Sequence, residues 1–176
     1  MSVIFLAGVH GVGKGYLGTP VAQSLGMDHC TASQLIREEK GHATWGINKR
    51  VADLDDNQSA LIGAIKKRLE SGQDILLDGH FVLRDASGGM VRLAEKVFAD
   101  LRLSGVVLLS ENAVTIAERL TRRDGVIVNL EAIAELAEEE SIHAQTICNA
   151  LQIPLVRLSF PSVPTLTEAV LHLRGS

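Results

Sequence analysis

The sequence has few cysteines, no excess of positive charge and no long uninterrupted apolar run. Its two cysteines, Cys30 and Cys148, allow at most one disulfide, and neither stands in the short spacing of a zinc or redox motif. The 21 acidic residues outnumber the 17 basic ones and give a net charge of -4, so no general field attracts nucleic acid or an anionic membrane. Any site for an anion must therefore be local.

The apolar run at 3–9 reaches glycine long before it could span a membrane, and the N-terminus does not begin with the positive charges of a signal peptide. Together with the low cysteine content, these features favour a cytoplasmic protein with no membrane partner. A chain of 176 residues, 46% of them hydrophobic, is long enough for one compact domain, 1–176. A domain of this size buries roughly 70% of the surface of its unfolded chain.

Four short apolar runs are each followed by residues that break a strand. They lie at 3–8, 74–79, 104–110 and 153–160, and a fifth short strand is expected at 27–30. Runs that are continuously apolar, rather than alternating, are typical of strands covered by helices on both faces. Helical patterns lie between them, at 58–71, 90–102, 113–120, 129–151 and 165–174. The alternation predicts an α/β fold of three layers, with a central, mostly parallel sheet of about five strands.

Two polar segments are interpreted as solvent-exposed. The acidic run Glu138–Glu140 is expected on the solvated face of the long helix that contains it. The segment 40–56 is the least regular part of the chain and is expected to form an exposed excursion. Trp45, the only tryptophan, lies there, either as a local anchor or as a ligand contact.

The stretch GVHGVGKGYL at 8–17 has the spacing of a phosphate-binding loop. Gly8, Gly13 and Lys14 follow the pattern G-x-x-x-x-G-K, directly after a buried-strand pattern and before a helical one. Glycines let consecutive backbone N–H groups point inward, and the following helix adds its positive end. We expect a triphosphate site in which the Lys14 ammonium holds the β- and γ-phosphate oxygens. The alternative is a glycine-rich turn with an incidental lysine.

This loop resembles that of the adenylate kinases, members of the nucleoside-monophosphate kinases, whose loops read G-x-x-G-x-G-K-G-T. The resemblance implies a P-loop NTPase fold with ATP and Mg²⁺ as cofactors, and the metal is held in that family largely through water and phosphate. Tyr16 stands where the family has threonine, which leaves its backbone N–H as the phosphate contact. The residues expected to contact ATP are Gly8, His10, Gly11, Val12, Gly13, Lys14, Gly15 and Tyr16.

The segment TASQLIR at 31–37 is similar to the family's S-T-G-D-L-L-R, whose start borders the acceptor base and whose arginine holds the acceptor phosphate. The resemblance implies these roles for Thr31 and Arg37, and a guanidinium suits a phosphate because its planar fork grips two oxygens. The alternative is a surface arginine beside the charged residues that follow. Ser33 and Gln34 replace the family's Gly-Asp, so the base preference does not transfer.

The run ILLDGH at 75–80 looks like the family's strand that ends L-L-D-G-F-P-R, and like the D-x-H form of its archaeal-type members. Asp78 is expected at the carboxyl end of a buried strand, where α/β sheets bind ligands, and there it would orient Mg²⁺ through water beside Lys14. A purely structural role, such as capping the next loop, is the alternative. His80 and Arg84 are further candidates for contact with the acceptor.

The segment ERLTRRDG at 118–125 resembles the arginine-bearing entry to the family's lid. Positioned arginines stabilise the charge that spreads over a transferring phosphoryl group, and the candidates are Arg119, Arg122 and Arg123. Cations near a helix C-terminus are also ordinary structural features. The resemblance implies an acceptor-binding excursion at 31–72 and a short lid at 119–130.

The leading hypothesis is transfer of the γ-phosphoryl group of ATP to a nucleoside monophosphate, with AMP as the first candidate. A second hypothesis keeps the ATP site but assigns a metabolite or nucleic-acid hydroxyl as acceptor, with Asp78 or His80 as the base. A third is an ATP-responsive binding module without transfer activity. Nucleotides are the expected partners, and long nucleic acid is not, because no basic stripe is visible. A protein partner and the oligomeric state are left open.

Overall fold

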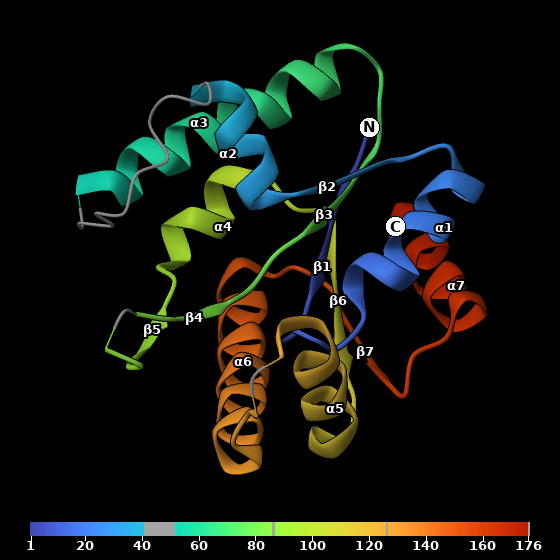
Figure 1. Cartoon of the computed structure of the whole chain (residues 1–176). Helices are drawn as coiled ribbons and strands as arrows, with labels where there is room; N and C mark the ends of the chain where they lie inside the picture. Colours follow the sequence, from blue (N-terminus) through green and yellow to red (C-terminus); the bar gives the residue numbers. More distant parts are fainter. Residues whose placement is uncertain (41–51, 86, 126, 176) are drawn as a thin grey trace.

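The computed structural model describes residues 1–40, 52–85, 87–125 and 127–175, and of 52–55 only the backbone. The chain forms three layers, with a five-stranded parallel sheet between two layers of helices (Figure 1). This arrangement confirms the predicted fold class. The order of the strands is β2-β3-β1-β6-β7, and their bounds are β1 Val3–Ala7, β2 Asp28–Thr31, β3 Ile75–Asp78, β6 Gly105–Ser110 and β7 Leu155–Ser159.

Strand β1 lies at the centre of the sheet, and all five of its residues are buried. It pairs in parallel with β3 on one side and with β6 on the other, so that Leu6 lies opposite both Asp78 and Val107. Parallel pairing brings the carboxyl ends of these strands to one edge of the sheet. The loop after Ala7 and the polar end of β3 therefore meet there.

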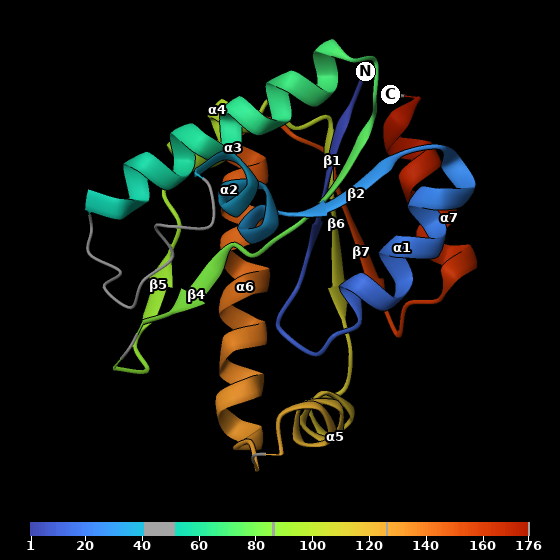
Figure 2. The same ribbon diagram turned by 45° about the horizontal axis from the view of Figure 1, so that its top comes forward.

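The helices cover both faces of the sheet. Their bounds are α1 Lys14–Leu25, α2 Ala32–Lys40, α3 Ala52–Glu70, α4 Glu95–Leu101, α5 Ala113–Asp124, α6 Leu130–Leu151 and α7 Val163–Arg174. Helices α1 and α7 pack on one face, over Ile4 and Leu6, whereas α3, α4 and α6 pack on the other, over Phe5. Figure 2 shows these two groups on opposite sides of the strands, with α5 beyond the carboxyl ends of β1 and β6.

A small antiparallel hairpin follows β3 and was not predicted. Its strands are β4 Val82–Arg84 and β5 Met90–Arg92, and they occupy the start of the helix expected at 90–102, which begins only at Glu95. The Asp85 carboxylate accepts hydrogen bonds from the backbone N–H groups of Ser87 and Gly89 and so closes the turn. The hairpin is held by this local polar turn rather than by an apolar pattern.

Two further differences concern the region after β2. The segment TASQLIR at 31–37 ends β2 and begins α2, a helix that the apolar patterns do not predict. Helix α3 begins at Ala52, six residues before the expected start at 58. Most of the segment 40–56, Trp45 included, lies outside the described residues. Within the described residues, no helix is both long and apolar enough to cross a bilayer.

Replacement of Gly79 by alanine should destabilise the fold. A Cβ at Gly79 would lie 2.6 Å from ring atoms of Phe5. The Phe5 ring cannot move away easily, because it makes edge contacts with Phe81 and Phe98, at 5.2 and 5.8 Å between ring centroids. We expect Gly79→Ala to lower the free energy of unfolding by about 1–3 kcal/mol in urea titrations. The control Gly63→Ala meets nothing closer than 3.7 Å in α3 and should stabilise by a few tenths to about 1 kcal/mol. Equal values for the two variants would contradict this prediction.

Candidate active site

The glycine-rich loop lies between β1 and α1. Gly8, Gly11 and Gly13 have positive φ angles of 140°, 82° and 107°, a region that side chains with a Cβ rarely adopt. At Gly8 a Cβ would also lie 2.7 Å from the backbone oxygen of Leu109. Val12 is buried, at 1% exposure, and its side chain packs in the apolar core with α1. The first turn of α1 follows at Lys14, which is the arrangement expected of a phosphate-binding loop.

Lys14 is buried, with 7% of its side chain exposed, and its ammonium donates to the backbone oxygens of Gly8 and Val9. The same Nζ lies 3.7 Å from a carboxylate oxygen of Asp78, at the end of β3. Burial lowers the pKa of Lys14, and the carboxylates of Asp78 and Glu140 oppose that shift. Burial raises the pKa of Asp78, while Lys14 acts in the opposite direction. The structure thus brings the two residues together, and their roles toward phosphate and Mg²⁺ stay predictions.

His80 packs against His10 of the loop, with 4.2 Å between the ring centroids and an angle of 44° between the ring planes. Burial and the nearby Lys14 ammonium lower the pKa of His80 to about 2, and a hydrogen bond with the Gly8 backbone opposes the shift. Burial and Lys14 also lower the pKa of His10. His80 is therefore a neutral imidazole at neutral pH, and it lies against the phosphate loop. Its predicted contact with the acceptor would have to be a hydrogen bond and not an ion pair.

The three arginines predicted for the lid lie on α5. Arg119 reaches the loop, where it donates to the backbone oxygens of Gly11 and Val12 at 3.3 and 3.0 Å, and it pairs with Glu111 at 3.5 Å. Arg123 forms an ion pair with its neighbour Asp124, and Arg122 is exposed in the same last turn. Of these three arginines, Arg119 donates hydrogen bonds to the phosphate loop, whereas the charge of Arg123 acts on His10. Tyr16, on α1, is 84% exposed.

The residues predicted to bind the acceptor lie on β2, α2 and β4 and in the segment after β3. The Thr31 hydroxyl accepts from the backbone N–H of Gln34 at the start of α2, and Arg37 is exposed on the same helix. Arg84 donates to the backbone oxygens of Gly88 and Ala132, at 2.9 and 2.7 Å, and so joins the hairpin to α6. The acceptor site, the excursion at 31–72 and the lid at 119–130 stay predictions.

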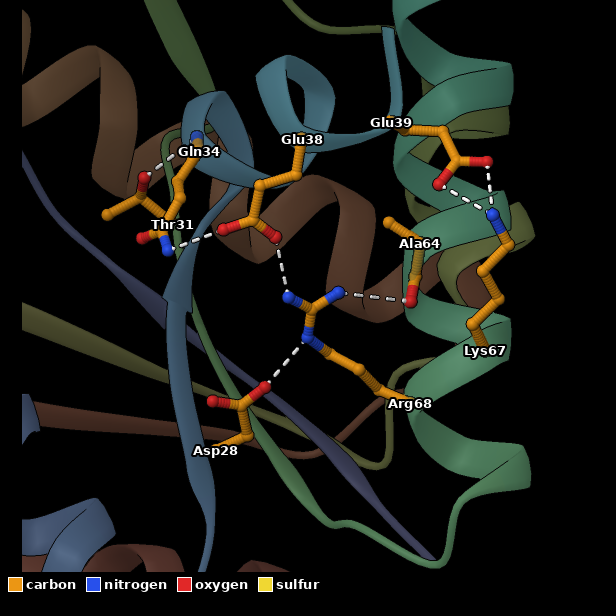
Figure 3. Close-up of polar contacts among 8 residues, drawn as sticks. All are labelled: Asp28, Thr31, Gln34, Glu38, Glu39, Ala64, Lys67 and Arg68. Atoms are coloured by element: carbon orange, nitrogen blue, oxygen red, sulfur yellow. Dashed lines mark hydrogen bonds and ion pairs between the residues drawn. The ribbon is translucent and has the colours of Figure 1, made fainter. Parts of the chain in front are cut away.

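An ion-pair network holds α2 against α3 and β2 (Figure 3). Arg68, on α3, donates to Asp28 at 2.7 Å and to Glu38 at 2.6 Å, and Figure 3 shows its guanidinium between these two carboxylates. Glu38 also accepts from Gln34, and Lys67 pairs with Glu39 at 2.7 Å. Because Asp28 belongs to β2 and Glu38 to α2, the network fixes the helix that contains Arg37 relative to the sheet.

Glu140 was interpreted as a solvated residue, and that interpretation is wrong. Its side chain, on α6, is 1% exposed and accepts hydrogen bonds from the backbone N–H groups of Gly8, Phe81 and Val82. Position 140 comes seven residues after the buried Ile133 and four before the buried Ala144, so it lies on the apolar stripe of the helix. That spacing was the signal in the sequence, and the run of three glutamates obscured it.

The sheet order, the glycine-rich loop after the central strand and the buried lysine define a P-loop NTPase fold. Three solved structures illustrate the likeness. A sugar kinase from Janibacter sp. HTCC2649 has a TM-score of 0.60 at 17% identity, covering 99% of this chain and 95% of that one. Shikimate kinase from Acinetobacter baumannii has a TM-score of 0.60 at 18% identity, and the match covers 99% of this chain and 93% of that one. A gluconokinase from Sinorhizobium meliloti 1021 has a TM-score of 0.54 at 18% identity, and the match covers 99% of this chain and 91% of that one. At these identities the likeness concerns the fold alone.

A family model described as an AAA domain matches residues 7–136. The match covers most of the chain, so the chain belongs to this family. No curated protein matches the sequence.

The buried histidine next to the loop should make stability depend on pH. The pKa of His80 is about 2 in the folded protein and near 6.5 in the unfolded chain, so the unfolded state binds a proton that the folded state does not. Stability is therefore full above pH 6.5 and falls as the pH decreases, by about 1.4 kcal/mol per pH unit between pH 6 and 5.

His80→Gln removes this titration, and urea unfolding at pH 7, 6 and 5 should show a shallower loss of stability than in the wild type. His29, whose pKa burial also lowers, contributes equally to both proteins. Parallel curves for the wild type and His80→Gln would contradict the assignment.

Proposed function

We propose that the protein transfers the γ-phosphoryl group of ATP to a small-molecule acceptor, and that the acceptor is a nucleoside monophosphate, with AMP first. The observation that supports this proposal is the buried Lys14 ammonium, which lies between the loop carbonyls and Asp78 at the carboxyl edge of the sheet. No structural role needs a buried cation there, because an apolar side chain would pack at lower desolvation cost.

Phosphoryl transfer needs positioning and charge stabilisation more than covalent chemistry by the protein. The bond between the γ-phosphorus and its bridging oxygen breaks, a bond to an acceptor oxygen forms, and ADP leaves with the electron pair. The backbone N–H groups of the loop and Lys14 would hold the phosphates, and Arg119, already on the loop, would stabilise the developing charge. Arg37 would hold the acceptor phosphate, whose oxygen needs no general base.

Mg²⁺ fits the oxygen donor at the end of β3. Asp78 supplies a carboxylate beside Lys14, and among the described residues no cluster of three or more potential ligands competes for the metal. A single carboxylate with water and phosphate oxygens is the kind of coordination that Mg²⁺ accepts. When bound with ATP, the ion would neutralise charge on the β- and γ-phosphates.

We assign the protein to the cytoplasm, in keeping with two buried cysteines that form no disulfide.

A hydroxyl acceptor is the second candidate, and two observations favour it. The similar folds include proteins named as a sugar kinase, a gluconokinase and a shikimate kinase. Two groups next to the loop could also take a proton from a hydroxyl: Asp78, whose pKa burial raises, and the neutral His80. Incubation with labelled ATP and separate panels of nucleoside monophosphates, sugars, sugar acids and 5′-hydroxyl oligonucleotides separates the two candidates. Transfer to hydroxyl acceptors alone would exclude the leading one.

Lys14→Met should abolish transfer. The variant keeps the length of the side chain but removes the charge on the transferring phosphates, and we expect kcat to fall at least 100-fold, or about 2.7 kcal/mol in the activation free energy. The control Lys66→Met breaks only the exposed pair with Glu70 and should retain full turnover. A Lys14→Met protein that turns over like the control refutes the proposal, and ATP binding without transfer to any acceptor would indicate a binding module.

Arg68→Met should weaken binding of the monophosphate acceptor without weakening binding of ATP. The change frees Asp28 and Glu38 and so loosens α2, which contains Arg37, while the phosphate loop is untouched. We expect the KM for the monophosphate to rise several-fold with little change in the KM for ATP, as measured by steady-state kinetics. The control Arg92→Met breaks an exposed pair with Glu139 and should change neither value. An equal rise in both KM values would contradict the role of the network.

A further inference from the structure

Glu140 joins two segments that lie far apart in the sequence. Its Oε1 accepts from the backbone N–H groups of Gly8 and Phe81 at 3.2 and 3.0 Å, and its Oε2 accepts from those of Phe81 and Val82 at 2.9 and 2.7 Å. Gly8 opens the phosphate loop, whereas Phe81 and Val82 directly follow the Asp78–His80 segment. One carboxylate therefore contacts both walls of the candidate site.

The position of Glu140 follows from where the β1–β3 ladder ends. The paired strands reach Leu6 and Asp78, and the N–H of Gly79 still donates to the Leu6 oxygen at 3.1 Å. Beyond that point the two backbones separate, and buried N–H groups there need an acceptor other than a strand. The side chain of Glu140 enters from α6 and supplies that acceptor. It continues the connection between β1 and β3 after the sheet has ended.

Stability alone does not explain a carboxylate at this depth. Burial raises the pKa of Glu140, which means that the charged form pays for desolvation, although the three backbone N–H groups and Lys14 oppose the shift. Buried charges are often replaceable by apolar groups without loss of stability. The hydrogen bonds of Glu140 are instead directed at the two backbone segments whose spacing sets the distance between Lys14 and Asp78, 3.7 Å in this structure.

We propose that Glu140 is a positioning residue that fixes the phosphate loop relative to the Asp78–His80 segment. The inference rests on the proposed phosphotransfer at this site. Glu140 acts through Gly8 and through Phe81 and Val82, and its carboxylate, used by these N–H groups, does not itself contact substrate. A displacement of about 1 Å between catalytic groups can cost roughly 100-fold in rate.

Glu140→Gln tests the proposal because it removes one acceptor and keeps the shape. A glutamine has a single carbonyl oxygen, and that oxygen is best placed at the Oε2 position, where the two shorter bonds lie. The amide NH₂ then faces the N–H groups of Gly8 and Phe81, so the Gly8 N–H loses its acceptor, whereas Phe81 keeps its bond to the remaining carbonyl oxygen. We expect kcat to fall roughly 10- to 100-fold when it is measured well below the melting temperature of the variant. The control Glu138→Gln, at an exposed position of the same helix, should keep the wild-type kcat.

Amide hydrogen exchange followed by NMR gives a second readout that needs no turnover. In the wild type the N–H groups of Gly8, Phe81 and Val82 should exchange with similar protection, because one carboxylate holds all three. In Glu140→Gln, protection of Gly8 should fall at least 10-fold while that of Val82 is kept.

The outcomes separate the two proposals. A wild-type protein that transfers no phosphoryl group defeats the proposed function, and the exchange data still test the link made by Glu140. If the wild type is active and Glu140→Gln matches Glu138→Gln in kcat, the inference is overturned. If Glu140→Gln does not fold, the wild-type exchange decides: a Gly8 amide that exchanges 10-fold faster than Phe81 and Val82 overturns the inference, and uniform protection supports it.

Discussion

The candidate site depends on one buried cation. The ammonium of Lys14 lies among the carbonyls of Gly8 and Val9 and beside Asp78, and the charge of Glu140 also acts on it. An ammonium at this depth is tolerated only when it is paired and hydrogen-bonded. Lys14 begins α1 on one face of the sheet, and its partners come from the loop after β1, from β3 and from α6 on the other face, so the charge can be held only when all three layers have folded. Assembly of the fold and assembly of the site are therefore one event.

The shape of the loop is determined as much by the sheet as by any ligand. Gly8 has a φ of 140°, and a Cβ there would lie 2.7 Å from the Leu109 backbone oxygen on the neighbouring strand β6. Glycine is thus required at this position by close packing against β6, before any phosphate is considered. The same closeness directs the backbone away from β3 and leaves the Gly8 N–H to Glu140. The conformation of the loop is in this way set by the fold itself.

The sequence predicts the features that depend on local pattern. The continuous apolar runs give four of the five strands, and parallel pairing then brings Lys14 next to Asp78, as the structure has it. The β4–β5 hairpin escapes prediction because its strands have three residues each and its turn depends on one aspartate. Glu140 escapes prediction because a run of three glutamates is typical of a solvated face, whereas the helical period places this residue on the buried stripe of α6. Arg68 could not be found at all, since its partners Asp28 and Glu38 lie 40 and 30 residues away.

The acceptor side differs from the ATP side in how its charges are held. Arg84 donates to two neutral backbone carbonyls. A phosphate could displace these carbonyls, because a guanidinium bonds more strongly to a charged oxygen than to a neutral one. Arg37 instead depends on α2, whose position is fixed by carboxylates paired with Arg68. An anionic acceptor would gain from either guanidinium, whereas a neutral hydroxyl acceptor would gain from neither and would need the base near Asp78. A hydroxyl acceptor that carries a carboxylate or phosphate elsewhere would gain from a guanidinium and still need that base. The need for a base is therefore the property that most sharply distinguishes the two candidate reactions.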